Sequence, residues 1–295
     1  IMKRYILFAV AAIQFILSGC GSVLMVEVSN PSDIDRDTEL VEVSLDDVKK
    51  TLNIKDGETF IVKDGAQEVP YQQTYDGKVV FPAQLKAQET KTYTFVKGTP
   101  AEVVTQVCGD HYPKRVDDLC WENDLIGFRT YGFKEDAPSG YDIFTKRSTD
   151  LPVIPEFYRR AKDPELTKIH KQLKKTDKRA ADRFNWDSLS FHVDHGYGCD
   201  VYAVGPTLGA GTTALLDGEN IVYPFCYDKF EILDDGPLRF TIKLVFRPFN
   251  LGDKENIVET RVITLDLGRY FNKTEISFEN LDRNPIVAGI VLQDK

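Results

Sequence analysis

The amino-acid sequence predicts a mainly β protein built in two parts. In residues 21–98, short β-branched and aromatic runs are separated by turn-forming pairs such as Asp56-Gly57, a pattern typical of a small β-sandwich module. In residues 99–295 the runs are longer and alternate apolar with polar side chains, as in 238–246, which indicates a large antiparallel sandwich of two layers. Gly98-Thr99-Pro100 supplies the break between the two parts.

Each strand expected in the first part is a run of residues that favour extended backbone, bounded by Gly, Asp, Asn or Pro. These runs are 26–28, 40–43, 59–62, 78–81 and 92–96. Residues 46–52 interrupt them with the pattern of a single helical turn. The longer alternating runs of the second part are 126–131, 238–246, 260–265 and 274–278.

One segment, residues 156–185, breaks the β pattern. Asp163-Pro164-Glu165 places a cap residue, a first-turn proline and an acidic residue where a helix begins. Apolar residues then recur at helical spacing at Leu166, Ile169, Leu173, Ala180 and Phe184. The segment holds ten Lys or Arg against five Asp or Glu, a net of +5, so the chain total of −9 leaves −14 for the remainder. We expect a solvated helix packed on the sheet through its apolar stripe. Alternatively, the segment borders a cleft for an anionic ligand with Arg159, Arg160 and Lys162.

The N-terminus has the pattern of a bacterial lipoprotein signal peptide, residues 1–20. Lys3 and Arg4 precede an apolar run, and Leu17-Ser18-Gly19-Cys20 resembles a lipobox. The run is too short for a permanent membrane span, although a short buried helix is the alternative. We therefore expect export, lipidation of Cys20 and an anchor in the cell envelope. Because no acidic cluster follows Cys20, we expect the outer membrane, facing the periplasm.

Composition sets further bounds on the function. With 18 Phe, 13 Tyr and 2 Trp, the chain has ample material for a core, and its charge of −9 argues against a nucleic-acid partner. The cysteines that follow Cys20 allow three disulfide pairings or free thiols: Cys108, Cys120, Cys199 and Cys226. The sequence has no nucleophile elbow, phosphate loop or dinucleotide fingerprint, so no cofactor is assigned.

Residues 191–202 contain two of the four histidines, His192 and His195. Histidine is the side chain most easily tuned to move protons near neutral pH. If residues 191–195 are extended, His192 and Asp194 share one face and His195 lies on the other. His192 is then the stronger candidate for proton transfer.

Asp194 or Asp200 would orient the His192 ring, and Tyr197 or Tyr202 would protonate a leaving group. Two alternatives remain open for the same segment. A metal site would use His192, Asp194 and His195, although the alternation separates them. In the structural alternative, aspartates hydrogen-bond the histidines, and the histidines have no catalytic role.

A second polar cluster spans residues 115–124. Trp121 is a candidate for stacking on a sugar ring, and Glu122 and Asp124 are a candidate carboxylate pair for glycoside hydrolysis. Other candidate substrate-binding residues in or near the cluster are Arg115, Asn123 and Arg129. The alternative is a turn in which Asn and Asp cap backbone groups around a buried Trp.

Several of these segments resemble a known family. They are 26–31, 35–42, Trp121-Glu122-Asn123-Asp124, His192 to Tyr202, and Asp235-Gly236-Pro237-Leu238-Arg239. Together they are similar to exported proteins of the family called domain of unknown function 4861, from about residue 26 to the last residue. The resemblance implies a small β module followed by a galactose-mutarotase-like super-sandwich. It also leads us to expect further strands beyond 289–295, as in a truncated product.

Some members of that family resemble oligosaccharide dehydratases, which remove water from a terminal uronic acid. Such a reaction needs a cation for the carboxylate, a base for the C5 proton and an acid for the leaving hydroxyl. Arg129 or Arg115, His192, and Tyr197 or Tyr202 are the candidates for these three roles, with Trp121, Asn123 and His195 in substrate contacts. The expected partner is an anionic oligosaccharide. Alternatives are a non-catalytic glycan-binding lipoprotein and a hydrolase that uses Glu122 and Asp124.

Overall fold

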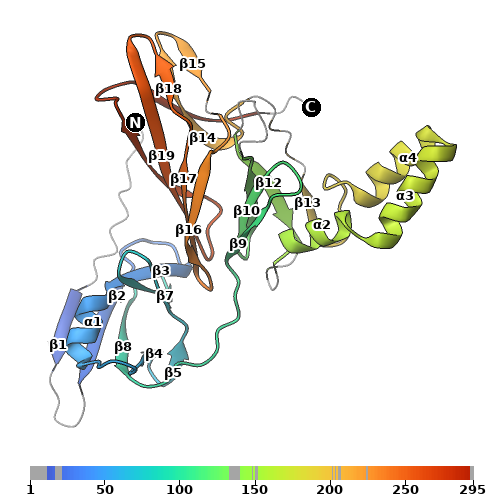
Figure 1. Cartoon of the computed structure of the whole chain (residues 1–295). Coiled ribbons are helices and arrows are strands. Elements are labelled where there is room, and N and C mark those ends of the chain that lie inside the picture. Colours follow the sequence, from blue (N-terminus) through green and yellow to red (C-terminus); the bar gives the residue numbers. More distant parts are fainter. Residues whose placement is uncertain are drawn as a thin grey trace. The chain divides into compact units, whose positions relative to one another are not determined.

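The computed structural model describes residues 12–16, 22–132, 140–147, 149, 152–200, 202, 204, 207–223 and 225–292. The lipobox with Cys20 and the last residues, 293–295, lie outside this part of the chain. The mainly β class is confirmed. The chain divides into two compact units, Ile1–Thr105 with Gly236–Arg239, and Gln106–Asp235 with Phe240–Lys295 (Figure 1).

The described part of the first unit forms two antiparallel sheets and one helix. One sheet has the order β1 (Ala12–Ile16), β2 (Val23–Ser29), β8 (Thr90–Lys97), β4 (Phe60–Asp64), β5 (Gln67–Val69). The other has the order β3 (Arg36–Ser44), β7 (Lys78–Leu85), β6 (Gln72–Gln73). Their facing side chains form one core that includes Phe60, Phe81, Tyr93 and Phe95.

The predicted helical turn of the first unit is helix α1, Leu45–Leu52. Ser44 caps its N-terminus, because the Ser44 hydroxyl accepts a hydrogen bond from the Asp47 amide. Asn53 ends it in the left-handed conformation at φ 52°. Val48 and Leu52 pack into the core of the unit.

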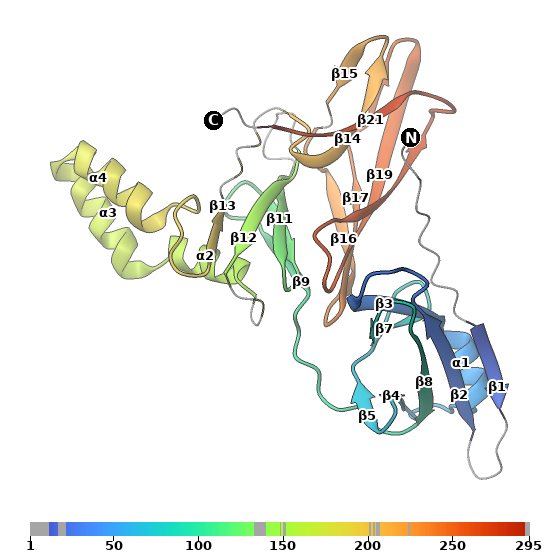
Figure 2. The same ribbon diagram turned by 180° about the vertical axis from the view of Figure 1, so that it is seen from behind.

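In the described residues of the second unit, the strands form three antiparallel sheets. The sheet that concerns function has the order β13 (Gly198–Asp200), β12 (Asp142–Lys146), β11 (Ile126–Thr130), β10 (Asp118–Glu122), β9 (Cys108–Tyr112). Another has the order β16 (Lys229–Asp235), β17 (Arg239–Val245), β19 (Lys254–Asp266), β18 (Phe249–Leu251), with β20 (Lys273–Glu279) also paired to β19. The third has the order β15 (Asn220–Val222), β14 (Ala210–Asp217), β21 (Ile286–Ile290) (Figure 2).

The β9–β13 sheet is covered on both faces. On one face the Trp121 ring stacks 6.4 Å from the Phe240 ring of β17, so this face packs against the β16–β20 sheet and forms a sandwich. Because side chains alternate along a strand, Cys120 points to the other face. There it joins Phe144 in a cluster covered by the helix α2 residues Ile154, Phe157 and Tyr158.

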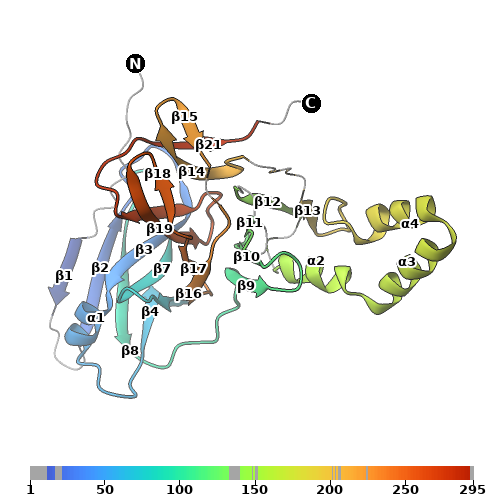
Figure 3. The same cartoon turned by 45° about the horizontal axis from the view of Figure 1, so that its top comes forward.

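The helical insertion differs from the single helix predicted over 156–185. It consists of α2 (Ile154–Ala161), α3 (Pro164–Thr176), α4 (Lys178–Phe184) and a π turn, Asn185–Leu189. The predicted capping by Asp163 is confirmed, since its carboxylate accepts from the amides of Glu165 and Leu166. The predicted packing of the stripe on the sheet is wrong. No residue of α3 is buried, and α3 packs on α4 and on the π turn, clear of the sheets of its unit (Figure 3).

No disulfide joins the described cysteines of the second unit, Cys108, Cys120, Cys199 and Cys226. Burial is the main cause that raises the pKa of the Cys108 thiol to about 12, so this thiol is protonated at neutral pH. Within the described ranges, no helix is long and apolar enough to cross a membrane.

Candidate functional site

The histidine segment is a turn, which corrects the prediction that residues 191–195 are extended. Asp194 builds this turn. Its Oδ1 atom accepts hydrogen bonds from the amides of Gly196 at 2.7 Å and Gly198 at 3.1 Å, and its Oδ2 atom pairs with Arg147. Asp194 therefore does not orient the ring of His192. The candidate metal set of His192, Asp194 and His195 is not assembled, and the described residues contain no other group of three ligands.

His192 is oriented by the backbone of Asp200. The Nδ1 atom of His192 lies 2.6 Å from the Asp200 carbonyl oxygen. A carbonyl oxygen only accepts hydrogen bonds, so Nδ1 carries the proton and Nε2 of the neutral ring holds a free lone pair. The ring also stacks on Trp186, with 5.8 Å between centroids and 26° between planes. Both side chains are exposed, and Trp186 is 54% exposed.

His195 and Tyr197 lie farther along the turn, against helix α2. The His195 Nε2 atom and the Tyr197 hydroxyl are both buried and have no hydrogen-bond partner among the described residues. Burial and the nearby Arg160 cation lower the pKa of His195. Burial raises the pKa of Tyr197, whose ring packs edge-on against Phe157 at 4.9 Å. At neutral pH the pair therefore holds a neutral imidazole and a protonated phenol.

Arg129 lies in a buried ion cluster under this turn. Its Nε atom donates to Asp142 at 2.7 Å, and its Nη2 atom donates to Asp200 at 2.7 Å. The Tyr131 hydroxyl also donates to Asp142. Because Arg129 is 2% exposed and shared by two carboxylates, it cannot serve as the carboxylate receptor predicted for it. Burial and the Asp142 charge raise the pKa of Asp200, and Arg129 opposes them.

Arg115 is an accessible guanidinium beside the histidine turn. Its side chain is 42% exposed, and its Nη1 atom donates to the buried Asp118 carboxylate at 2.8 Å. The guanidinium carbon lies 5.4 Å from the centre of the Phe191 ring and 5.9 Å from that of Tyr131. Since Phe191 immediately precedes His192, the structure brings Arg115 and the histidine turn together.

Three other predicted site residues are structural. Trp121 is fully buried in the sandwich, where its Nε1 atom donates to Asn272 at 2.9 Å, so it cannot stack on a sugar. The buried Asn123 amide donates to two carbonyls and accepts from two amides, which locks a turn. The Tyr202 hydroxyl lies 2.8 Å from the carbonyl oxygens of Gly209 and Val291, so its proton is already shared with the backbone.

The candidate carboxylate pair is also occupied by structural contacts. Glu122 is buried, accepts from the amides of Val153 and Ile154 at the start of α2, and pairs with Lys146 at 2.7 Å. Asp124 accepts from the Gly268 amide at 2.8 Å. These contacts remove the basis for predicting a hydrolase that uses the two acids.

A model of the family described as a domain of unknown function, DUF4861, matches residues 28–295. The chain belongs to the DUF4861 family. The resemblance found in the sequence is therefore confirmed. Both surface segments described above, around Arg115 and around His192, lie within the matched range.

Two further comparisons place this DUF4861 chain among known proteins. "Uncharacterized protein P7" of Formosa agariphila is 25% identical over 319 residues, which cover 99% of this chain and 74% of that protein. A solved structure of a protein in the glycosyl hydrolase family 38 from Enterococcus faecalis is similar with a TM-score of 0.43 and 9% identity. That similarity covers 89% of this chain and 32% of the other, so the DUF4861 chain spans about a third of its length.

Trp186 is the residue of the DUF4861 site that sequence reasoning missed. It is one of only two tryptophans and follows a basic helical segment, so its position in the sequence was a usable signal. With residues 191–195 interpreted as an extended strand, nothing in the sequence connected Trp186 with His192. The contact arises because the π turn Asn185–Leu189 and the histidine turn fold against each other.

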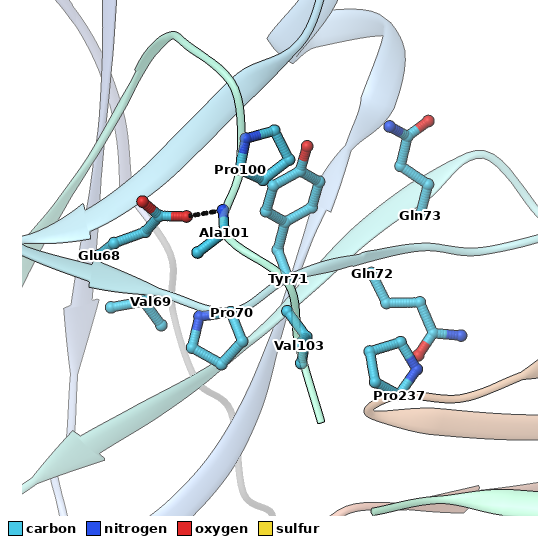
Figure 4. A pocket seen from close by; sticks show the side chains of 10 residues that line it. All are labelled: Glu68, Val69, Pro70, Tyr71, Gln72, Gln73, Pro100, Ala101, Val103 and Pro237. Atoms are coloured by element: carbon cyan, nitrogen blue, oxygen red, sulfur yellow. Dashed lines mark hydrogen bonds between the residues drawn. The ribbon is translucent and has the colours of Figure 1, made fainter. Parts of the chain in front are cut away.

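The first unit of the DUF4861 chain contains a separate pocket of about 310 Å³. Its apolar walls include Val69, Tyr71, Pro100 and Val103 (Figure 4). The Glu68 carboxylate in its wall accepts from the Ala101 amide at 2.7 Å, and the Tyr71 hydroxyl donates to the Phe60 carbonyl. None of the residues predicted to act on substrate lines this pocket.

Proposed function

We propose that this DUF4861 protein acts on uronic-acid-containing oligosaccharides and eliminates water from a terminal uronic acid, as a carbon–oxygen lyase. The observation that carries the proposal is that the accessible Arg115 packs on Phe191, the residue that precedes the exposed and oriented His192. Family membership supports it, because the resemblance to oligosaccharide dehydratases lies within the same family. The exposed Trp186 takes over the sugar-stacking role that the buried Trp121 cannot serve.

The proposed reaction assigns one role to each group. The Arg115 guanidinium binds the uronate carboxylate and stabilises the charge that develops on it as the C5–H bond breaks. The Nε2 atom of His192 accepts the C5 proton. The C4–O bond then breaks, a C4–C5 double bond forms, and the leaving hydroxyl takes a proton and departs as water. The buried Tyr197 hydroxyl cannot reach the sugar, so solvent water supplies that proton.

The test follows the unsaturated product by ultraviolet absorbance and follows chain cleavage by new reducing ends. We expect the wild-type protein to form the chromophore from acidic oligosaccharides without new reducing ends. His192→Ala should reduce the rate by about 10²–10⁴. Lys50→Ala, on the exposed surface of helix α1 in the first unit, is the control and should retain the rate. New reducing ends without a chromophore would replace the proposal with hydrolysis.

A glycan-binding role without catalysis is the second candidate. The exposed aromatic platform of Trp186 on His192 favours it, because such a surface binds a sugar ring whether or not a proton is transferred. Saturable binding of the acidic oligosaccharide that weakens in Trp186→Ala, with no chromophore from wild-type protein, would support this candidate over the lyase.

We further propose that the protein is exported and anchored through lipidated Cys20 in the outer membrane, facing the periplasm. The basic flank, the apolar run and the lipobox of residues 1–20 support this location. Metabolic labelling with a radioactive fatty acid should mark the wild-type chain and leave Cys20→Ser unlabelled. Protection of the chain from protease added to whole cells would support the inward-facing orientation, and digestion would refute it.

A further inference from the structure

We propose that the helical arm, defined as α3 and α4 (residues 164–184), is a docking surface for the continuing chain of an anionic polysaccharide. The inference rests on the proposed function for the class of substrate, and it extends the binding surface beyond the reacting sugar. The occupant is a polymer with regularly spaced carboxylate or sulfate groups.

The arm presents cations that are not used elsewhere. Its exposed cations without an ion-pair partner among the described residues are Lys171, Lys174, Lys175, Lys178 and Arg179. Lys168 adds a sixth charge and pairs only loosely with Glu165, at 4.0 Å. These charges are therefore available to an anion from outside the chain.

The cations run from the second turn of α3 into the start of α4. Lys168, Lys171 and Lys175 recur at intervals of three and four residues, so they lie on one face of the helix. Seven residues of helix span roughly 10 Å. The resulting positive ridge matches an extended chain with repeated negative charges better than a single small anion.

The charge of the whole chain directs an anionic polymer to this arm. Residues 164–184 hold seven Lys or Arg against three Asp or Glu, a net of +4, so the remainder carries −13 when the total is −9. A polyanion is therefore repelled by most of the chain and attracted by the arm. The attraction concerns exposed charges, so it weakens as the ionic strength rises.

The arm is also continuous with the proposed reaction surface. Helix α4 ends at Phe184, and the π turn that follows carries Trp186, which stacks on His192. A sugar held on Trp186 is thus attached to a chain that can continue along α3 and α4. Ile169, at 39% exposure, is the only large apolar side chain counted as exposed on the described arm, which argues against insertion into a lipid surface.

Affinity electrophoresis of the full chain tests this inference. The gel contains either polygalacturonate, the anionic probe, or dextran, the neutral probe. The arm variant is Lys171→Gln/Lys174→Gln/Lys175→Gln. The matched control is Lys49→Gln/Lys50→Gln/Lys55→Gln, which removes three exposed cations from the first unit. We expect polygalacturonate, and not dextran, to retard wild type and control. The arm variant should bind about tenfold more weakly, with a shallower dependence on salt.

Three outcomes would overturn the inference. In the first, polygalacturonate retards the arm variant as strongly as the wild type. In the second, the control variant loses as much retardation as the arm variant. In the third, the wild type binds vesicles of anionic phospholipid but is not retarded by polygalacturonate. His192→Ala separates this inference from the proposed function, since the variant should lose the chromophore and keep its retardation. Wild-type retardation without any elimination would refute the lyase and leave the docking surface standing.

Discussion

The Nδ1 atom of His192 lies 2.6 Å from the carbonyl oxygen of Asp200, while the Asp200 carboxylate pairs with Arg129 at 2.7 Å. One residue thus holds the exposed imidazole through its backbone and the buried guanidinium through its side chain. The orientation of His192 consequently depends on the ion cluster beneath it. This relationship makes Arg129 a positioning residue rather than a substrate contact.

Replacing Arg129 with Met should destabilise the fold by about 3–5 kcal/mol. The substitution leaves the Asp142 and Asp200 carboxylates buried without their shared cation. Urea denaturation measures the change in the free energy of unfolding. Asp142→Asn removes one carboxylate charge and keeps the ion pair between Asp200 and Arg129, so it should lower the free energy of unfolding by less. An Arg129→Met protein as stable as the wild type would contradict the description of the cluster.

Arg115→Lys should keep the fold and lose activity on acidic substrates. Lysine retains the charge beside Asp118 but lacks the planar, two-donor group that pairs with a carboxylate. We expect kcat/KM to fall at least roughly tenfold. The melting temperature should stay close to that of the wild type. Unchanged kcat/KM in Arg115→Lys would remove Arg115 from the proposed carboxylate site.

The two tryptophans should behave in opposite ways. Trp121→Ala should cost about 3–5 kcal/mol, because it opens a cavity between two sheets. Trp186→Ala should leave stability almost unchanged and weaken oligosaccharide binding, because its ring is exposed and stacks only on His192. Denaturation measures the stability of both variants, and calorimetric titration measures their binding of the oligosaccharide. A strong loss of binding in a folded Trp121→Ala protein would argue against this assignment.

Gly198 and Gly196 form a matched pair for the shape of the histidine turn. Both have positive φ, 121° and 104°, so Ala is strained at either position. A Cβ atom at Gly198 would also lie 2.0 Å from the Thr145 carbonyl oxygen, whereas one at Gly196 meets nothing within 4 Å. Gly198→Ala should therefore unfold more easily than Gly196→Ala, and thermal denaturation measures the difference. Equal melting temperatures would contradict this account of the β12–β13 contact.

The lowered pKa of His195 makes stability depend on pH in a defined direction. Burial and the Arg160 charge hold the folded-state pKa below 6.5, so the unfolded chain binds the proton more readily. The associated stability is present above pH 6.5 and is lost as the pH falls through the folded-state pKa. Arg160→Gln should raise that pKa and reduce the loss, while Arg160→Lys keeps the charge. Nuclear magnetic resonance titration of His195 checks the sign, and a downward shift in Arg160→Gln would refute it.

The sequence was sufficient for those features that depend on local pattern. The strand runs, the helical turn that forms α1, and the Asp163 cap of α3 are written in residues close to one another in the chain. The family was also recognisable from short segments such as His192 to Tyr202. The net positive charge of residues 156–185 likewise follows from the sequence alone.

Only tertiary structure decided which of the candidate residues are accessible. Alternation along β10 assigns Trp121 to a face, but the packing of β17 against that face is what buries it. The partners of Arg129 lie 13 and 71 residues away, and those of Tyr202 include Val291, 89 residues away. Burial and pairing of this kind arise from contacts between distant segments, and the local order of residue types does not encode them in a readable pattern.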